Sequence, residues 1–127
     1  MSTRTVIHSD EAPKAIGPYS QAIAVNGLAF CAGQTPIDPA TGNLVPGGIE
    51  EQTHQALKNV GAVLRAAGSD YSKVVKTTVF LKNMNDFAAM NAIYATYFTD
   101  APPARSTVEV ARLPKDCLVE VEAIALI

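Results

Sequence analysis

The C-terminal segment, from residue 117 to residue 127, constrains the fold most, because its residues alternate with the period of a β-strand. One side of this strand carries only apolar residues: Cys117, Val119, Val121, Ala123, Ala125 and Ile127. The other side mixes three apolar residues with two carboxylates: Leu118, Ile124 and Leu126 with Glu120 and Glu122. The apolar side predicts a covering layer of helices. The three apolar residues on the mixed side also need a cover, so we expect an oligomer interface there. Carboxylates are costly to bury unless they are paired or used, and a cleft at the interface would offer both.

The remaining residues indicate an α+β fold with the element order β-ββ-α-β-α-ββ. Asn26-Gly27 between apolar runs predicts a tight hairpin. Helical spacing predicts one helix over 49–67, ended by Gly68, and another over 87–98 with Asn85 or Asp86 as N-cap. Strands are expected over 5–7, 21–25, 28–32, 73–82, 105–113 and 117–126, and an irregular loop over 33–48. The pattern predicts a single domain, residues 1–127, in which two helices cover one face of a mixed sheet.

Composition narrows the class of protein. The chain has 127 residues, of which 48% are hydrophobic, so one packed core is expected. A net charge of -2, without a basic block, argues against a nucleic-acid partner. No apolar stretch approaches about 20 residues, so no membrane association is expected and the cytoplasm is the default location. Cys31 and Cys117 lie in separate apolar runs, and we interpret them as buried, reduced thiols.

The segment "PPARSTVEVARLP" places Arg105 two residues after the prolines Pro102 and Pro103, which hold the backbone extended. A guanidinium there is suited to bind the carboxylate of a small organic acid, although a surface arginine at a strand end is the alternative. A hairpin through residues 114–116 would place Glu120 opposite residues 109–111. The two side chains would then be about 13 Å apart along the strand and could converge on a ligand. Alternatively, the two groups meet across neighbouring subunits.

Four segments resemble the Rid (YjgF) family, in the order that the family has them. They are "AIGPYSQA" at 15–22, "AGQTPIDPATG" at 32–42, "VVKTTVFLKNMNDFAAMNAIYATYF" at 74–98 and "PPARSTVEVARLPKDCLVEVEAIA" at 102–125. The resemblance implies a chorismate-mutase-like α+β protomer and a homotrimer whose sheets form a central barrel with clefts between subunits. It also implies hydrolysis of 2-imino or 2-enamino acids, such as 2-iminobutanoate and 2-iminopropanoate, to 2-keto acids and ammonia.

The same resemblance implies roles for individual residues. Arg105 matches the arginine that binds the substrate carboxylate. Glu120 matches an acidic residue near the imine carbon, where it would orient or deprotonate water or stabilise the iminium. Tyr19 matches an aromatic residue that covers the ligand. The alternatives are a surface arginine, a solvated strand glutamate and a loop tyrosine that only packs.

Three further positions are implied as substrate-binding. Gly33 would let the backbone approach the ligand, and Asn91 matches a polar helix residue near the pocket. Thr107 stands where the family often has cysteine, so it would offer a hydrogen bond but no thiol. Ala32 stands where the family often has serine, which removes another hydroxyl. We interpret both departures as changes in substrate preference.

Other chemistry has weaker support in the sequence. Glu50 and His54 have the helical spacing of two metal ligands, but a surface pair is the simpler interpretation. An imine is already electrophilic, so neither a metal nor an organic cofactor is expected. Two alternatives to an imine hydrolase stay open. They are a trimeric protein that binds keto or amino acids without turnover, and a ribonuclease.

Overall fold

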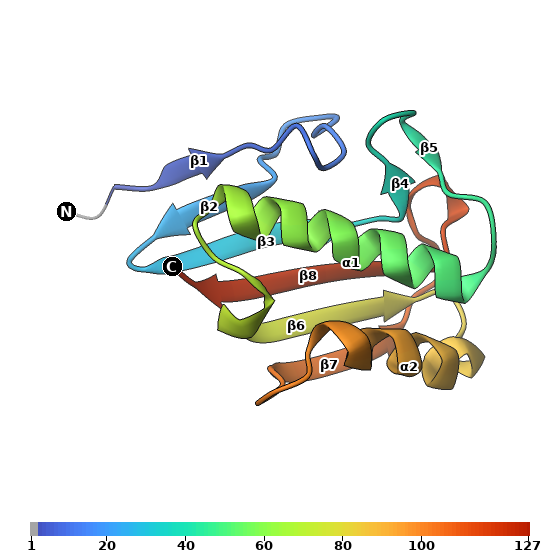
Figure 1. Cartoon of the computed structure of the whole chain (residues 1–127). Coiled ribbons are helices and arrows are strands. Elements are labelled where there is room, and N and C mark those ends of the chain that lie inside the picture. Colours follow the sequence, from blue (N-terminus) through green and yellow to red (C-terminus); the bar gives the residue numbers. More distant parts are fainter. Residues whose placement is uncertain (1–2) are drawn as a thin grey trace.

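The computed structural model describes residues 3–127, which form a six-stranded mixed sheet with two helices against one face (Figure 1). The strand order is β1-β2-β3-β8-β6-β7. These strands are β1 Thr5–Ile7, β2 Ala22–Val25, β3 Leu28–Gln34, β6 Val74–Leu81, β7 Ala104–Glu109 and β8 Val119–Leu126. The helices are α1 Ile49–Ala66 and α2 Phe87–Tyr97. The predicted α+β class, with two helices and a mixed sheet, is confirmed, and the sheet is mostly antiparallel.

Local sequence signals correctly predicted the turn between β2 and β3 and the end of α1. Asn26 and Gly27 both have positive φ, 54° and 75°, and join β2 to β3 as a two-residue hairpin. Helix α1 ends at the predicted glycine, because Gly68 adopts a φ of 82°. Its amide donates to the Arg65 carbonyl at 3.0 Å, and the Ser69 amide donates to the Leu64 carbonyl at 2.8 Å, which forms a Schellman motif. Between residues 3 and 127, no helix is long and apolar enough to cross a membrane.

Two local expectations need correction. The loop over 33–48 is not wholly irregular, because it contains a short antiparallel ribbon of β4 Ile37–Asp38 and β5 Asn43–Leu44. Asp86 occupies the position before α2 but makes no side-chain capping bond. The capping bond comes instead from Asn83, whose side chain accepts from the Asn85 amide at 2.9 Å and starts a 3₁₀ turn that leads into α2.

The predicted hairpin between the last two strands is wrong. Strand β6 lies between them, parallel to β7 and antiparallel to β8. The parallel pair is possible because α2 forms the crossover from β6 to β7, as a parallel connection requires. The connection after β7 therefore passes around the end of β6. The Val110 amide donates to the Leu81 carbonyl at 2.9 Å, and the Lys82 amide donates to the Leu118 carbonyl at 3.0 Å.

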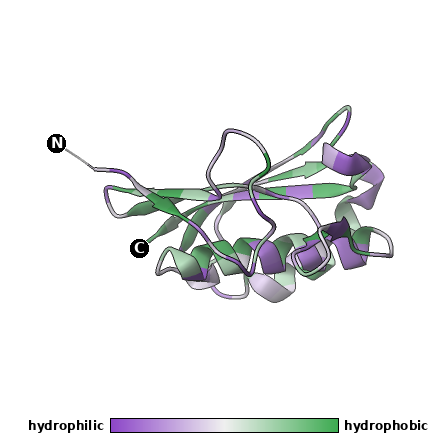
Figure 2. Cartoon of the chain, turned by 90° about the horizontal axis from the view of Figure 1, so that it is seen from above, coloured by the Kyte–Doolittle hydropathy of each residue, from purple (hydrophilic) through white to green (hydrophobic). Residues whose placement is uncertain are grey.

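The two faces of the sheet differ as the alternation in β8 predicted. The apolar side of β8 is buried beneath α1, and Val119 and Val121 are fully buried there. On the other face, Phe30 is 42% exposed and Leu126 is 50% exposed. Figure 2 shows both helices on one side of the sheet. Within the described residues this second face therefore retains exposed apolar side chains.

Replacing the buried Leu57 of α1 by alanine is expected to lower the free energy of unfolding by about 2–5 kcal/mol, because it leaves a cavity. Urea denaturation measures the change. Ile16, which is 80% exposed, provides the control, and its alanine variant should stay within about 0.5 kcal/mol of wild type. Equal losses in the two variants would contradict the assigned core.

Candidate functional site

Arg105 lies on the helix-covered face, near the start of the edge strand β7. Its neighbour in β6 is Thr77, which is fully buried under the helices. One guanidinium nitrogen, Nη1, donates to Oδ1 of Asn91 on α2 at 2.6 Å. The guanidinium carbon also lies 4.7 Å from the ring centre of Tyr94 and 5.4 Å from that of Phe87. The structure thus brings Arg105 and Asn91 together, with Asn91 bonded to the arginine itself.

Glu120 lies on the opposite face of the sheet. Its neighbour in β6 is Phe80, three residues from Thr77, so its side chain points away from Arg105. Burial raises the pKa of Glu120 above its ordinary value, and the negative charge of Glu122 raises it further. A larger fraction of this carboxyl therefore stays protonated near neutral pH than for a solvated glutamate.

Gly33 makes room for the Glu120 side chain. It lies where the register of β3 against β8 shifts, between Cys31 and Gln34. A Cβ atom at position 33 would lie 2.5 Å from Oε2 of Glu120 and 2.9 Å from its carboxyl carbon. The missing side chain therefore determines where the carboxylate lies. The predicted approach of the Gly33 backbone to a ligand remains a prediction.

Tyr19 is 54% exposed and lies at a cleft of about 490 Å³ that Gly33 and Glu120 also line. Two lysines, Lys14 and Lys115, add positive charge to its lining. The structure thus brings Tyr19, Gly33 and Glu120 together in one cleft. Arg105 and Asn91 are not part of it.

Two buried polar side chains shape this cleft, and the sequence analysis did not identify them. Gln21 accepts from the Ser9 amide at 2.6 Å and donates to the Pro13 carbonyl at 2.9 Å. Asn59 of α1 donates to the carbonyls of Thr35 and Ile37, each at 2.9 Å. Each side chain fixes a loop that lines the cleft. The available signal was an amide residue inside an otherwise apolar pattern, which needs hydrogen-bond partners when it is buried.

The interpretation in which Arg105 and Glu120 converge within one chain is wrong. It depended on a hairpin between their strands, whereas β6 separates the two strands and the side chains point to opposite faces. A small ligand cannot reach across a sheet. The alternative, in which neighbouring subunits supply the two groups, remains a prediction.

Thr107 follows Arg105 on the helix-covered face and pairs with the buried Val79. Its hydroxyl oxygen is buried and has no hydrogen-bond partner among residues 3–127. The structure thus places Thr107 beside the arginine. Its hydroxyl is a polar group that a ligand or a rearrangement would have to satisfy.

The cysteines and His54 lie in other surroundings. Cys31 and Cys117 are buried and unpaired, as predicted, and burial raises the pKa of each thiol to about 11. The thiols are therefore protonated and unreactive at neutral pH. His54 does not pair with Glu50; its Nδ1 lies 2.9 Å from the Tyr97 hydroxyl. Across the described part of the chain, no group of three or more His, Cys, Asp or Glu residues is placed to hold a metal ion.

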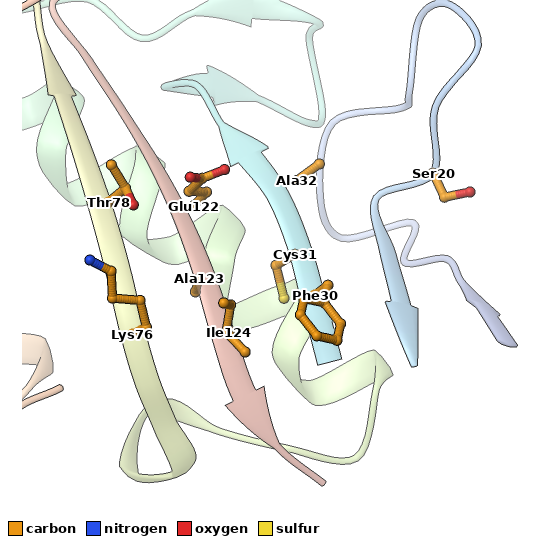
Figure 3. Close-up of a pocket in the computed structure, with 9 residues that line it drawn as sticks. All are labelled: Ser20, Phe30, Cys31, Ala32, Lys76, Thr78, Glu122, Ala123 and Ile124. Atoms are coloured by element: carbon orange, nitrogen blue, oxygen red, sulfur yellow. The ribbon is translucent and has the colours of Figure 1, made fainter. Parts of the chain in front are cut away.

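A second cavity, of about 330 Å³, opens on the uncovered face of the sheet (Figure 3). Strands β3, β8 and β6 supply most of its lining, including Phe30, Glu122 and Lys76. The Lys76 amine donates to the Ser106 hydroxyl at 3.1 Å, across to β7. This cavity combines exposed apolar surface with unlike charges, and it adjoins the exposed apolar side chains on the same face.

Comparisons with known proteins identify the family. Residues 9–127 match the family model described as Endoribonuclease L-PSP. A mouse relative named 2-iminobutanoate/2-iminopropanoate deaminase is 54% identical over 123 residues, which cover 97% of this chain and 91% of the mouse protein. The four sequence motifs therefore indicated the family correctly: the chain belongs to the Rid/YjgF family.

Solved structures agree with this assignment. A Yersinia pestis protein, described as a member of the conserved Rid family of unknown function, has a TM-score of 0.96 at 54% identity. The match covers 98% of this chain and 100% of that one. Escherichia coli TdcF with bound serine has a TM-score of 0.93 at 41% identity, covering 97% of this chain and 98% of that one. The fold is therefore shared along nearly the whole chain.

Replacing Glu122 by glutamine is expected to lower the pKa of Glu120. Removing a neighbouring negative charge makes deprotonation easier, whereas burial continues to hold the pKa above its ordinary value. Titration of the Glu120 carboxyl carbon by NMR measures the change. Glu50→Gln, on the exposed surface of α1, is the matched control and should leave the titration unchanged. Identical titrations in wild type and Glu122→Gln would show that the two carboxylates do not interact.

Proposed function

We propose that this protein hydrolyses 2-imino and 2-enamino acids, such as 2-iminobutanoate and 2-iminopropanoate, to 2-keto acids and ammonia. The observation that carries the proposal is the arginine held by α2, with Nη1 of Arg105 hydrogen-bonded to Asn91 and the guanidinium carbon over the rings of Tyr94 and Phe87. A guanidinium held in this way is suited to bind the planar carboxylate that every such substrate has. The name of the mouse relative supports the same reaction.

The chemistry needs a carboxylate anchor, a water molecule and a group that exchanges protons. Water adds to the imine carbon, the C–N bond breaks, and ammonia leaves as the carbonyl forms. Glu120 has a raised pKa, so it can exchange a proton closer to neutral pH than a solvated glutamate can. It acts as the base towards water or orients the water beside a cationic iminium. Tyr19 covers the ligand from the mouth of the cleft.

The active site in this proposal is shared between subunits of a homotrimer. Arg105 and Glu120 lie on opposite faces of one sheet, so each face of a single chain offers a ligand only one of the two groups. The uncovered face carries exposed apolar residues, including Phe30, Val108 and Leu126, which a neighbouring chain would bury. One subunit then supplies Arg105 and Asn91, and its neighbour supplies the cleft that contains Glu120.

A second candidate function is ligand binding without turnover. The solved TdcF structure contains bound serine, an amino acid that has the carboxylate but no imine. An anchored guanidinium would recognise keto and amino acids equally well through that group. Turnover by this protein is the property that separates the two functions.

A coupled assay tests the proposed reaction. A threonine dehydratase generates 2-iminobutanoate, and release of 2-ketobutanoate is followed with and without this protein. Wild type is expected to accelerate release, and Arg105→Ala is expected to lose at least about 100-fold in kcat/KM, because a charged hydrogen-bond partner of the carboxylate is lost. Arg65→Ala, on the exposed end of α1, is the matched control and should behave as wild type.

Two results would contradict the reaction. If wild type binds 2-ketobutanoate but does not accelerate its formation from 2-iminobutanoate, the protein binds ligands without turnover. If purified protein cleaves RNA and Arg105→Ala does so equally, neither carboxylate function accounts for the activity.

Mixing two inactive variants tests the shared site. Arg105→Ala and Glu120→Gln are unfolded together in equal amounts and refolded. Each site then receives its Arg105 side and its Glu120 side from two subunits chosen at random, and each side is intact in about half of the cases. About one quarter of the sites therefore regain both groups, and about one quarter of wild-type activity returns. Each variant refolded alone is the control. An inactive mixture whose subunits have exchanged would show that Arg105 of one subunit and Glu120 of its neighbour do not form one site.

A further inference from the structure

The residues that surround Arg105 form a stripe along α2. Phe87, Asn91 and Tyr94 are spaced by four and three residues, so they lie on one side of the helix. All three contact the guanidinium: Asn91 through a hydrogen bond of 2.6 Å, and the two rings at 5.4 and 4.7 Å. The guanidinium is therefore contacted by three side chains of a single helix.

Tyr94 is the most firmly held member of this stripe. Its side chain is only 6% exposed, and its hydroxyl lies 2.7 Å from the hydroxyl of Thr77 on β6. Its ring also packs on Phe98, with 4.6 Å between ring centres. Thr77 is the strand neighbour of Arg105, so the bond joins α2 to the sheet at the level of the arginine.

The contact between the Tyr94 ring and Arg105 suits a guanidinium that must remain free to bind a ligand. The face of an aromatic ring is negative and attracts a guanidinium. A carboxylate binds through the guanidinium N–H groups, of which Asn91 engages those of one nitrogen, Nη1. The ring attracts the positive charge of the whole group, so it can hold Arg105 in place while other N–H donors remain for a carboxylate. An anchor oriented before binding loses less conformational entropy when the ligand arrives.

We propose that Tyr94 is a positioning residue that presets the Arg105 guanidinium for the carboxylate of the ligand. This inference rests on the proposed role of Arg105 and assigns its orientation to the buried ring rather than to the ligand. The effect falls on binding, which a carboxylate anchor provides equally in the ground state and the transition state. KM and the Kd of 2-ketobutanoate therefore depend on the ring, and kcat does not.

The first experiment removes the ring and then restores it. Tyr94→Leu is expected to raise KM for 2-iminobutanoate and the Kd for 2-ketobutanoate about tenfold, with kcat little changed. Tyr94→Phe keeps the ring and should return both values to near wild type. Tyr97→Leu is the matched control. It also removes a ring from α2, but the Tyr97 ring contacts His54 and Tyr71. An equal rise in KM for Tyr97→Leu would overturn the inference.

The second experiment keeps the shape of the side chain, since leucine at a buried position can disturb α2. Phenylalanine and pentafluorophenylalanine are placed at position 94 by nonsense suppression, and the Kd of 2-ketobutanoate is measured by calorimetry. The rings are similar in size, but fluorination reverses the charge of the face, so weaker binding is expected for the fluorinated ring. In both proteins, NMR relaxation of the Arg105 Nε–H group reports whether the side chain is held before ligand is added.

The outcomes separate this inference from the proposed function. Weaker binding and a more mobile Arg105 in the fluorinated protein support it. Equal affinities for the two rings, in folded proteins with equally ordered Arg105, reject the positioning role alone. A wild type that neither binds 2-ketobutanoate nor hydrolyses the imine rejects the proposed function, and the positioning role with it.

Discussion

The pairing of β6 with β7 along one edge and β8 along the other determines where the candidate residues lie. Thr77 places Arg105 on the helix-covered face, and Phe80 places Glu120 on the opposite face. Because side chains alternate along a strand, no rotamer can bring the two groups together. The hydrogen-bonded register of one central strand therefore divides the charged residues into a guanidinium beneath α2 and a carboxyl group in a separate cleft.

The crossover helix α2 supplies the surroundings of Arg105. A parallel pair needs a connection that returns to the same end of the sheet, and α2 serves as that connection between β6 and β7. The same helix then lies over the edge strand that carries Arg105. The topology and the surroundings of Arg105 are linked, because the element that allows the parallel pairing also supplies the aromatic rings and the Asn91 amide around the guanidinium.

Local sequence signals predicted local structure well. The Asn26-Gly27 turn and the Gly68 helix end follow from backbone conformations that few residues adopt, and the burial of β8 follows from its alternation. The strand order could not be read in this way, because pairing joins segments far apart in the chain. A helix between two strands does indicate a parallel crossover, and that pattern was the signal against the expected hairpin. The roles of the six candidate residues remain predictions, and the sheet divides them into two groups that no spacing rule predicted.

The close approach of Gly33 to Glu120 means that a substitution at position 33 can displace the carboxyl group without unfolding the protein. A methyl group at position 33 would meet the end of a flexible side chain, which can move aside, and Gly33 has no positive φ to strain. Alanine there would displace the carboxyl group and leave the core intact. Cellular quality control recognises chains that unfold, not carboxylates that are misplaced. A Gly33→Ala variant would therefore stay folded and reach normal abundance in the cell. Selection would act on it only through a change in activity.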